Sequence, residues 1–383
     1  MLKRRKILVT TGTRAEYGIF RPVLEKIEMS KKLDLLLVVT GTHNSKKYGM
    51  TINEIKKDGF KIYSKIDMVP KGDSGFHMAS SVGEGILQFS KVFKKLRPDI
   101  NLVLGDRDEV LASCIAAYHM NIPNAHIHGG DITGAGIDEY NRHAITKISN
   151  IHFPATKKSK NRIIRMGENP KTVFLTGSPG IDEIANNKIS DKQTLEKKYG
   201  IKFTNNEILV VQHPVTSGSQ KTESYIKNIL DAIVKEQKTT IVIAPNSDAG
   251  NKIIFSYMKK YSKKYSFIKY YPTIPRADYL GMLKNCRLLI GNSSSGIIEG
   301  SYFDTAIIQI GIRQHNREVG KIIIRIDANT TNDVTSAIKK AFKMKMLKKK
   351  EKIYGQGNSS EKIVKVLENI CLSNKLINNK MFY

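Results

Sequence analysis

Acidic, basic and histidine side chains are concentrated in the stretch from Gly105 to His143. It begins Gly-Asp-Arg-Asp-Glu and later reads Ala-His-Ile-His-Gly-Gly-Asp-Ile-Thr-Gly-Ala-Gly-Ile-Asp-Glu-Tyr-Asn-Arg-His. When several carboxylates share a pocket, their mutual repulsion raises the pKa of one of them. A carboxyl group with a raised pKa is suited to proton transfer to and from a substrate. We therefore predict acid–base chemistry here. The candidate proton carriers and their cationic neighbours are Asp106, Arg107, His128, Asp131, Asp138, Glu139, Arg142 and His143.

Two short apolar runs must position these groups. A strand expected at 100–104 runs directly into Asp106, and a strand expected at 124–127 runs into His128. In open α/β sheets the carboxyl ends of neighbouring strands face one crevice, where ligands bind. The alternative, a set of solvated loop charges, is disfavoured because these charges follow apolar runs. Arg142 would hold the carboxylates, meet substrate oxygens, or pair with Asp138 four positions earlier.

A metal site is a second interpretation of the same stretch. His126, His128 and Asp131 have the residue types and the close spacing of a metal-ligand cluster. A metal-dependent hydrolase is therefore a rival hypothesis, which predicts bound metal and inactivation by chelators. The acid–base interpretation requires no metal and no cofactor.

The beginning of the chain predicts a strand, a turn of small residues and a helix. The strand covers 6–10, the turn reads Thr-Gly-Thr-Arg, and the helix extends to about Met29. This is a Rossmann-type beginning, but it lacks G-x-G-x-x-G, so a dinucleotide-dependent dehydrogenase is disfavoured. Arg14 in the turn suits phosphate, because its planar fork matches phosphate oxygens. A second strand, 33–39, leads to His43 at the same predicted edge.

A loop rich in serine and glycine is the clearest ligand signal in the second half. Gly291 to Gly296 follows a short apolar strand and begins a helix, where backbone N–H groups and the helix dipole favour an anion. Ser293 and Ser294 add hydroxyl donors, and Glu299 one turn later can accept two ribose hydroxyls. A single N-cap serine is the alternative, but three serines flanked by glycines exceed that need. Arg313, after the next strand, can add positive charge. His213, at another strand end, can donate to phosphate; the alternative is a loop histidine whose hydrogen bonds are satisfied within the protein.

Strands and helices alternate along both halves, which predicts two Rossmann-like α/β domains. In the first half we expect a last strand at 172–175; in the second, strands at 207–211, 240–244, 267–271, 288–290 and 306–310. Thr-Gly-Ser-Pro-Gly at 176–180 interrupts the alternation of strands and helices, so we expect the hinge between the two domains there. We expect a sugar-side domain over 1–177, a nucleotide-side domain over 178–358, and a C-terminal helix and tail over 359–383 that packs back toward the first domain.

Composition excludes several classes of protein. The 383 residues carry 63 Lys and Arg against 35 Asp and Glu, a net charge of +28. No interleaved aromatic pattern of the kind that stacks bases accompanies this charge, so a nucleic-acid partner is disfavoured as a rival. Three widely separated cysteines fit a reducing compartment, and no apolar run is long enough to span a membrane. We expect a cytoplasmic protein.

A set of short motifs, in this order along nearly the whole chain, resembles the UDP-N-acetylglucosamine 2-epimerase family. No single motif is specific, but their joint presence is. Ala-Glu-Tyr-Gly after Arg14 is most similar to the hydrolysing branch. The motifs lie at 11–18, 105–107, 126–131, 142–147, 212–214, 245–246, 291–299, 311–314 and 354–358.

The resemblance implies a glycosyltransferase-B-like fold, with the two domains facing a cleft, and a hydrolysing reaction. UDP is eliminated anti across C1 and C2 to give a 2-acetamidoglucal, and water adds with inverted configuration at C2 to give N-acetylmannosamine, a sialic acid precursor. The substrate partner is a UDP-sugar, and a homodimer is expected. The predicted catalytic residues are Asp106, His128, Asp131, Asp138, Arg142 and His213. The predicted substrate-binding residues are Arg14, His43, Arg107, Asn246, Ser293, Ser294, Gly296, Glu299 and Arg313.

One position departs from the family pattern. His128 stands where the family usually has a glutamate that serves as a base. Either His128 or Asp131 takes that role, or the substrate is a related one, such as a UDP-linked diacetamido sugar of the legionaminic acid route. The non-hydrolysing reaction and a retaining glycosyltransferase remain alternatives with the same nucleotide site.

Overall fold

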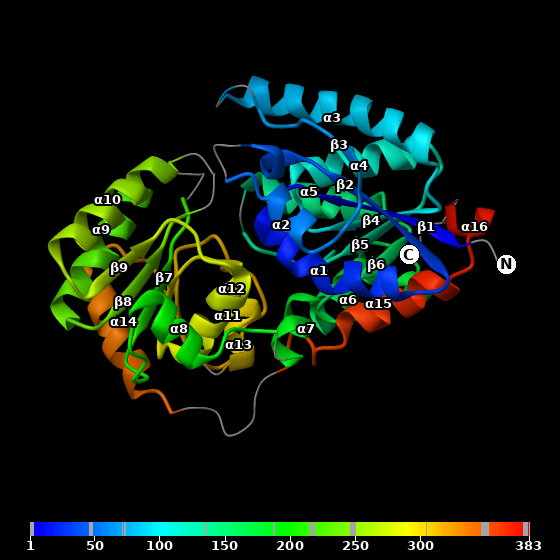
Figure 1. Ribbon diagram of the computed structural model, residues 1–383. Coiled ribbons are helices and arrows are strands. Elements are labelled where there is room, and N and C mark those ends of the chain that lie inside the picture. The colour runs from blue at the N-terminus through cyan, green and yellow to red at the C-terminus, as the bar shows by residue number, and fades with distance from the viewer. Residues whose placement is uncertain are drawn as a thin grey trace. The chain divides into compact units, whose positions relative to one another are not determined.

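The computed structural model describes residues 4–45, 49–70, 72, 74–134, 136–186, 188–214, 219–245, 250–303, 305–345, 352–377 and 382. The chain divides into two compact units, each built on its own sheet (Figure 1). The first unit comprises Met1–Asp131, Ile137–Asp182 and Tyr354–Tyr383, and the second comprises Ile132–Gly136 and Glu183–Ile353. Each unit is therefore assembled from segments that are distant in the sequence.

The first unit contains a six-stranded parallel sheet in the order β3-β2-β1-β4-β5-β6. The order reverses between β1 and β4, which is the switch point where doubly wound sheets bind ligands. The strands are β1 (Arg5–Thr11), β2 (Leu33–Val39), β3 (Ile62–Lys65), β4 (Ile100–Leu104), β5 (Asn124–Ile127) and β6 (Ile151–Phe153).

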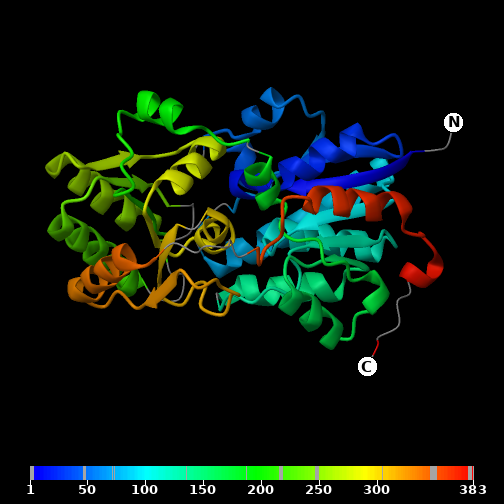
Figure 2. The same cartoon turned by 90° about the horizontal axis from the view of Figure 1, so that it is seen from below.

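Helices cover both faces of this sheet, because its strands are apolar on both sides. Ile7 and Val9 of β1 join one core layer with α1 and α15, whereas Leu8 joins the opposite layer with α3 and α4 (Figures 1 and 2). The helices are α1 (Arg14–Met29), α2 (Ile52–Lys57), α3 (Gly75–Leu96), α4 (Asp108–His119), α5 (Gly136–Lys147), α6 (Lys157–Arg165), α7 (Gly180–Ala185), α15 (Ser359–Asn369) and α16 (Asn374–Ile377), with 3-10 turns η1 (Gly41–Asn44) and η3 (Pro170–Thr172).

The C-terminal helix α15 is anchored in the first unit by a buried carboxylate. Asp182 accepts the backbone N–H groups of Ser359 and Ser360, at 2.9 and 2.6 Å, and so satisfies donors at the start of the helix. The Ser178 N–H donates to the Tyr354 carbonyl at 2.7 Å. The apolar face of α15 then packs against α1, burying Ile363 and Leu367.

The second unit repeats the plan with a six-stranded parallel sheet in the order β12-β11-β10-β7-β8-β9. One core layer lies beneath α9, α10 and α14, and the other beneath α8 and α11. The elements are α8 (Lys192–Tyr199), β7 (Ile208–Val211), α9 (Ser219–Glu236), β8 (Thr240–Ile243), α10 (Asn251–Lys264), β9 (Ile268–Tyr271), α11 (Arg276–Asn285), β10 (Leu288–Gly291), α12 (Ser294–Ile298), α13 (Gly300–Phe303), β11 (Ala306–Ile310), β12 (Ile323–Ile326) and α14 (Thr331–Lys343).

The prediction of two Rossmann-like α/β domains is confirmed. The strand predicted at 172–175 is wrong, since Val173 forms only an isolated bridge to His152 and the residues before it form the 3-10 turn η3. The edge strand β12 was not predicted, because its residues are only partly buried and it has one strand neighbour.

Among the described residues, no helix combines the length and the apolar character that crossing a membrane requires.

Candidate active site

Arg142 joins three segments at the carboxyl edge of the first sheet. Its side chain is 3% exposed and forms an ion pair with Asp106, in the loop after β4. Its Nη1 also donates to the carboxylate of Glu139 and to the main-chain oxygen of Asp131, both at 3.3 Å. The predicted neighbours Asp106, Asp131, Glu139 and Arg142 are therefore brought together, although they come from two strand ends and one helix.

Asp131 and His128 form a buried pair beside this arginine. Nδ1 of His128 lies 3.3 Å from Oδ2 of Asp131, and the Ser159 hydroxyl donates to Oδ1 of Asp131 at 2.6 Å. A carboxylate oxygen accepts hydrogen bonds, so Nδ1 is the ring nitrogen that donates to Asp131, and Nε2 lies 2.9 Å from the Ser178 hydroxyl. His128 has a φ of 65°, a left-handed conformation that costs about 1–2 kcal/mol outside glycine. Such strain is concentrated at functional sites.

The two histidines of the metal hypothesis, His126 and His128, have different hydrogen-bond partners. Nε2 of His126 donates to the Gly105 carbonyl at 2.7 Å, and Nδ1 lies 3.3 Å from the Thr146 hydroxyl. Burial lowers the pKa of His126 to about 3, so its ring is neutral. In the part of the chain that the structure describes, no three His, Cys, Asp or Glu side chains lie close enough to hold a metal ion.

Arg107 is paired within its own loop. Its Nε lies 3.2 Å from Oε2 of Glu109, and the Glu109 carboxyl lies over the backbone at the ends of β1 and β2. A Cβ added at Gly41 would lie 2.4 Å from Oε1 of Glu109, and one at Gly12 would lie 3.1 Å from its Cδ. Glycine at both positions therefore leaves room for the Glu109 carboxylate at the switch point between β1 and β4. Glu109 was not among the site residues predicted from the sequence. The signal in the sequence was the place of Glu109 in Gly-Asp-Arg-Asp-Glu, directly after the strand expected at 100–104.

Glu16 is a further buried carboxyl at the same switch point. The Gly12 N–H donates to its Oε2 at 3.0 Å, and Oε1 has no hydrogen-bond partner among the described residues. Burial, and secondarily the charge of Glu109, raises the pKa of Glu16 to about 8. Arg107 and the N–H groups of Gly12 and Thr13 act in the opposite direction.

This raised pKa predicts a pH-dependent stability. The folded state favours neutral Glu16, so its contribution is fully present below pH 4.5 and is lost as the pH rises through about 8. Glu16→Gln keeps the acceptor for Gly12 and cannot ionise. We expect it to leave stability unchanged at pH 4.5 and to raise it at pH 8.5, on the order of 4 kcal/mol. Urea unfolding of both proteins across this range tests the prediction, and parallel profiles would contradict it.

Three other predicted residues of the first unit lie near this edge in different settings. Arg14 begins α1 and its Nε lies 3.2 Å from Oε1 of Glu54. His43 is fully buried between the hydroxyls of Thr11 and Thr51, at 3.1 and 2.7 Å, so its ring presents no surface to a ligand here. Burial lowers the pKa of His43 to about 4. Asp138 is partly buried in the first turn of α5. The roles of all three in catalysis or binding remain predictions.

In the second unit, the ends of β7 and β10 are joined through one side chain. Oδ1 of Asn292 accepts the His213 N–H at 2.7 Å, and its Nδ2 donates to the His213 carbonyl at 2.9 Å. Gly291 makes this contact possible, because its φ is 147° and an added Cβ would lie 2.0 Å from the Val211 carbonyl oxygen. The His213 ring is partly buried beside this edge.

The serine loop provides the N-cap of α12, through Ser293. The Ser293 hydroxyl accepts the Ser295 N–H at 3.3 Å, and Ser294 is the first helical residue. Gly296 lies against the core, where an added Cβ would lie 2.9 Å from Leu289 Cδ2. Its lack of a side chain is thus explained by packing of the helix on β10, and its predicted substrate contact remains a prediction.

Glu299 follows α12 and is buried. Its Oε1 accepts from Nη2 of Arg276 at 2.8 Å, while Oε2 has no hydrogen-bond partner in the described parts of the chain. Arg313 is partly buried two residues beyond Gly311, at the end of β11. Asn246, also predicted to bind substrate, lies outside the described residues.

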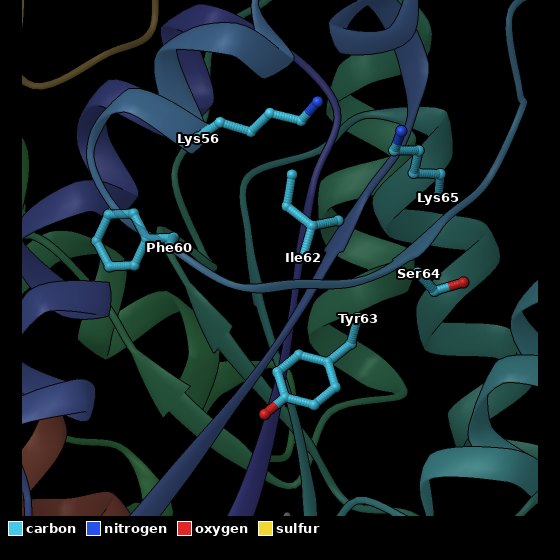
Figure 3. A pocket seen from close by; sticks show the side chains of 6 residues that line it. All are labelled: Lys56, Phe60, Ile62, Tyr63, Ser64 and Lys65. Carbon is cyan, nitrogen blue, oxygen red and sulfur yellow. The ribbon is translucent and has the colours of Figure 1, made fainter.

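A hollow of about 490 Å³ lies elsewhere, along the edge strand β3 (Figure 3). None of the predicted site residues contributes to it. Its lining side chains are Lys56, Phe60, Ile62, Tyr63, Ser64 and Lys65. The candidate site residues of each unit are therefore the polar and charged groups at the carboxyl edge of that unit's own sheet.

Comparison with known proteins finds relatives that match nearly the whole chain. A UDP-N,N'-diacetylbacillosamine 2-epimerase (hydrolyzing) of Legionella pneumophila is 37% identical over 98% of both chains. A UDP-N-acetylglucosamine 2-epimerase of Neisseria meningitidis serogroup B is 32% identical over 95% of both. A crystal structure of a Neisseria meningitidis UDP-GlcNAc 2-epimerase bound to UDP-GlcNAc superposes with a TM-score of 0.82 at 18% identity, covering 94% of this chain and 99% of that one.

The two Rossmann-like sheets define a two-domain α/β protein of the glycosyltransferase-B-like fold. The family described as UDP-N-acetylglucosamine 2-epimerase matches residues 25–368, and the chain belongs to this family. It is accordingly a UDP-sugar 2-epimerase.

Proposed function

We propose that this protein is a hydrolysing 2-epimerase that releases UDP from a UDP-linked 2-acetamido sugar. UDP departs from C1 while a carboxylate removes the C2 proton, and water adds to the resulting glucal with inverted configuration at C2. The C2 proton is not acidic by itself. Departure of UDP builds positive charge at C1 and acidifies it, so groups that stabilise the leaving diphosphate also promote proton loss.

The observation that carries the proposal is the cluster of carboxylates around Arg142 at the edge of the first sheet. Asp106 is the best-placed base, because its side chain is 23% exposed whereas that of Asp131 is 3% exposed. The ion pair with Arg142 favours the ionised form of Asp106, which is the form that accepts a proton. Asp138, partly buried in the first turn of α5, is a second proton carrier that can meet the sugar.

His128 takes the position of the family glutamate, and we assign it together with Asp131. The Asp131 carboxylate accepts from Nδ1 of His128 and so fixes the orientation of the ring, as the aspartate of a catalytic triad does for its histidine. Nε2 is then the nitrogen that can exchange a proton, through the Ser178 hydroxyl that it now contacts. A shared role for the pair accounts for the substitution without an additional base.

The second unit provides donors for the diphosphate and an acceptor for the ribose. His213, Ser293, Ser294 and the N–H groups that begin α12 lie at the ends of neighbouring strands, β7 and β10. Uncompensated N–H groups at a helix start favour phosphate oxygens. Arg313 adds positive charge in this unit, and Glu299 accepts from the ribose. In the first unit, Arg14 and Arg107 are the cations that we propose for substrate binding.

For the sugar we favour UDP-N,N'-diacetylbacillosamine, because the Legionella relative named for it matches this chain end to end at 37% identity. The second candidate is UDP-N-acetylglucosamine, which the family description and the Neisseria relative support. The two sugars share the C1, C2 and 2-acetamido groups on which the reaction acts. They differ at C4 and C6, so the same mechanism serves both.

Incubation with each nucleotide sugar in turn tests the proposal, with free UDP and the released sugar as the two readouts. We expect equimolar UDP and a C2-inverted free sugar, with a higher kcat/KM for the diacetamido substrate. A higher kcat/KM for UDP-N-acetylglucosamine would favour the second candidate. A C2-inverted sugar that still carries UDP would replace the hydrolysing reaction by the non-hydrolysing one.

A further inference from the structure

Arg276, at the start of α11, lies between two buried carboxylates of the second unit. Its Nε donates to Oε2 of Glu183 at 2.5 Å and its Nη2 donates to Oε1 of Glu299 at 2.8 Å. The two carboxyl side chains are 6% and 3% exposed. Burial alone would lower the pKa of the Arg276 guanidinium, but the charges of Glu299 and Glu183 outweigh it and raise this pKa.

The geometry leaves one carboxylate oxygen available. Oε2 of Glu299 is buried and accepts no hydrogen bond from any described residue, while Oε1 is held by Arg276. A buried charged acceptor without a hydrogen bond keeps the full cost of its desolvation, and proteins rarely retain one without a partner. A ligand donor is the partner that fits, and hydroxyl groups are donors of the right kind for a carboxylate.

Helix α11 also contacts the serine loop at the start of α12. One turn after Arg276, the Tyr279 hydroxyl donates to Oγ of Ser295 at 2.7 Å. Ser295 is in the first turn of α12, and Glu299 directly follows that helix. The beginning of α11 thus contacts both ends of α12 through two separate side chains, and Arg276 is the one that donates to the Glu299 carboxylate.

We propose that Arg276 is a positioning residue for nucleotide recognition: by holding Oε1 of Glu299, with Glu183 fixing its own orientation, it presents Oε2 to a ribose hydroxyl of UDP. This inference rests on the proposed function. A guanidinium is required because its planar fork bonds two carboxylates at once, whereas an ammonium on a flexible stem does not hold both in fixed directions.

Calorimetry with UDP and 2′,3′-dideoxy-UDP separates positioning from a merely structural role. Wild-type protein should bind UDP at least about tenfold more tightly than the dideoxy analogue, the usual effect of a hydrogen bond to a charged group. Arg276→Lys keeps the positive charge, so the two carboxylates stay compensated. It should weaken UDP binding about five- to tenfold and dideoxy-UDP binding less than twofold. Glu299→Gln should reduce the preference for UDP to the same extent.

The control is Tyr279→Phe, which removes the other contact of the same helix turn. It should change the affinities for UDP and dideoxy-UDP by the same factor. If Arg276→Lys also changed both affinities equally, the arginine would support the fold alone and the inference would be overturned. Wild-type protein that binds UDP and dideoxy-UDP equally would overturn it while leaving the proposed function intact, whereas absence of UDP binding would overturn both.

Discussion

Replacing Asp106 by asparagine should lower kcat by roughly 10³-fold and leave the affinity for UDP within about threefold of wild type. Asparagine keeps the shape of the side chain and an oxygen for Arg142, but it cannot accept the C2 proton. Loss of a positioned general base typically costs 10²- to 10⁴-fold, roughly, in rate. Arg142 retains Glu139 as a carboxylate partner, so the local packing should survive. Steady-state UDP release and calorimetry with UDP measure the two quantities.

Asp108→Asn is the matched control for this change. Asp108 is the first residue of α4, two positions after Asp106, and accepts from the Asn141 side chain at 2.9 Å, which an asparagine oxygen also does. We expect its kcat within about threefold of wild type. If kcat of Asp106→Asn fell by less than tenfold, Asp106 would not be the base, and Asp138 would become the leading candidate.

Gly291→Ala should destabilise the second unit by more than about 4 kcal/mol. The added Cβ would lie 2.0 Å from the carbonyl oxygen of Val211, its partner in the neighbouring strand. Both groups belong to the backbone of a buried sheet, so no side-chain rotation relieves the overlap and β7 and β10 must separate. The contact of Asn292 with His213 depends on the same spacing, and UDP binding should be lost as well.

Gly200→Ala separates this overlap from backbone strain. Gly200 ends α8 in the same unit with a φ of 62°, and an added Cβ there would meet no atom within 4 Å. The strain of a left-handed alanine costs about 1–2 kcal/mol. Urea unfolding followed by circular dichroism compares the two variants. Equal losses of stability would mean that close approach of the strands is not what position 291 requires.

The fold was predictable because local pattern and burial agree along most strands. Ile100–Leu104 is a mostly apolar run and Asn124–Ile127 a short segment with two apolar residues; polar residues follow both, and the structure places strands at these two segments. The parallel order then brings the residues that follow these strands to one edge, where Arg142 contacts both the Asp106 carboxylate and the main-chain oxygen of Asp131. The pattern was misleading at 172–175, where an apolar segment makes only one bridge, through Val173.

The partners of the site residues were less predictable, because they depend on contacts between distant segments. Nothing near Asp131 in the sequence indicates that Ser159 donates to it, 28 positions later. The position of Glu109 over Gly41 is equally non-local, as is the contact of Arg276 with Glu299. Periodicity identifies which residues end a strand, whereas the direction of each side chain is set by the whole packed unit.

Reaction in deuterium oxide, followed by proton NMR, tests the coupling of proton removal to UDP departure most directly. We predict that every released sugar carries solvent deuterium at C2 in the inverted configuration, with one UDP formed per sugar. Released UDP with the original hydrogen retained at C2 would indicate simple hydrolysis at C1, and it would contradict the assignment of a base at the edge of the first sheet.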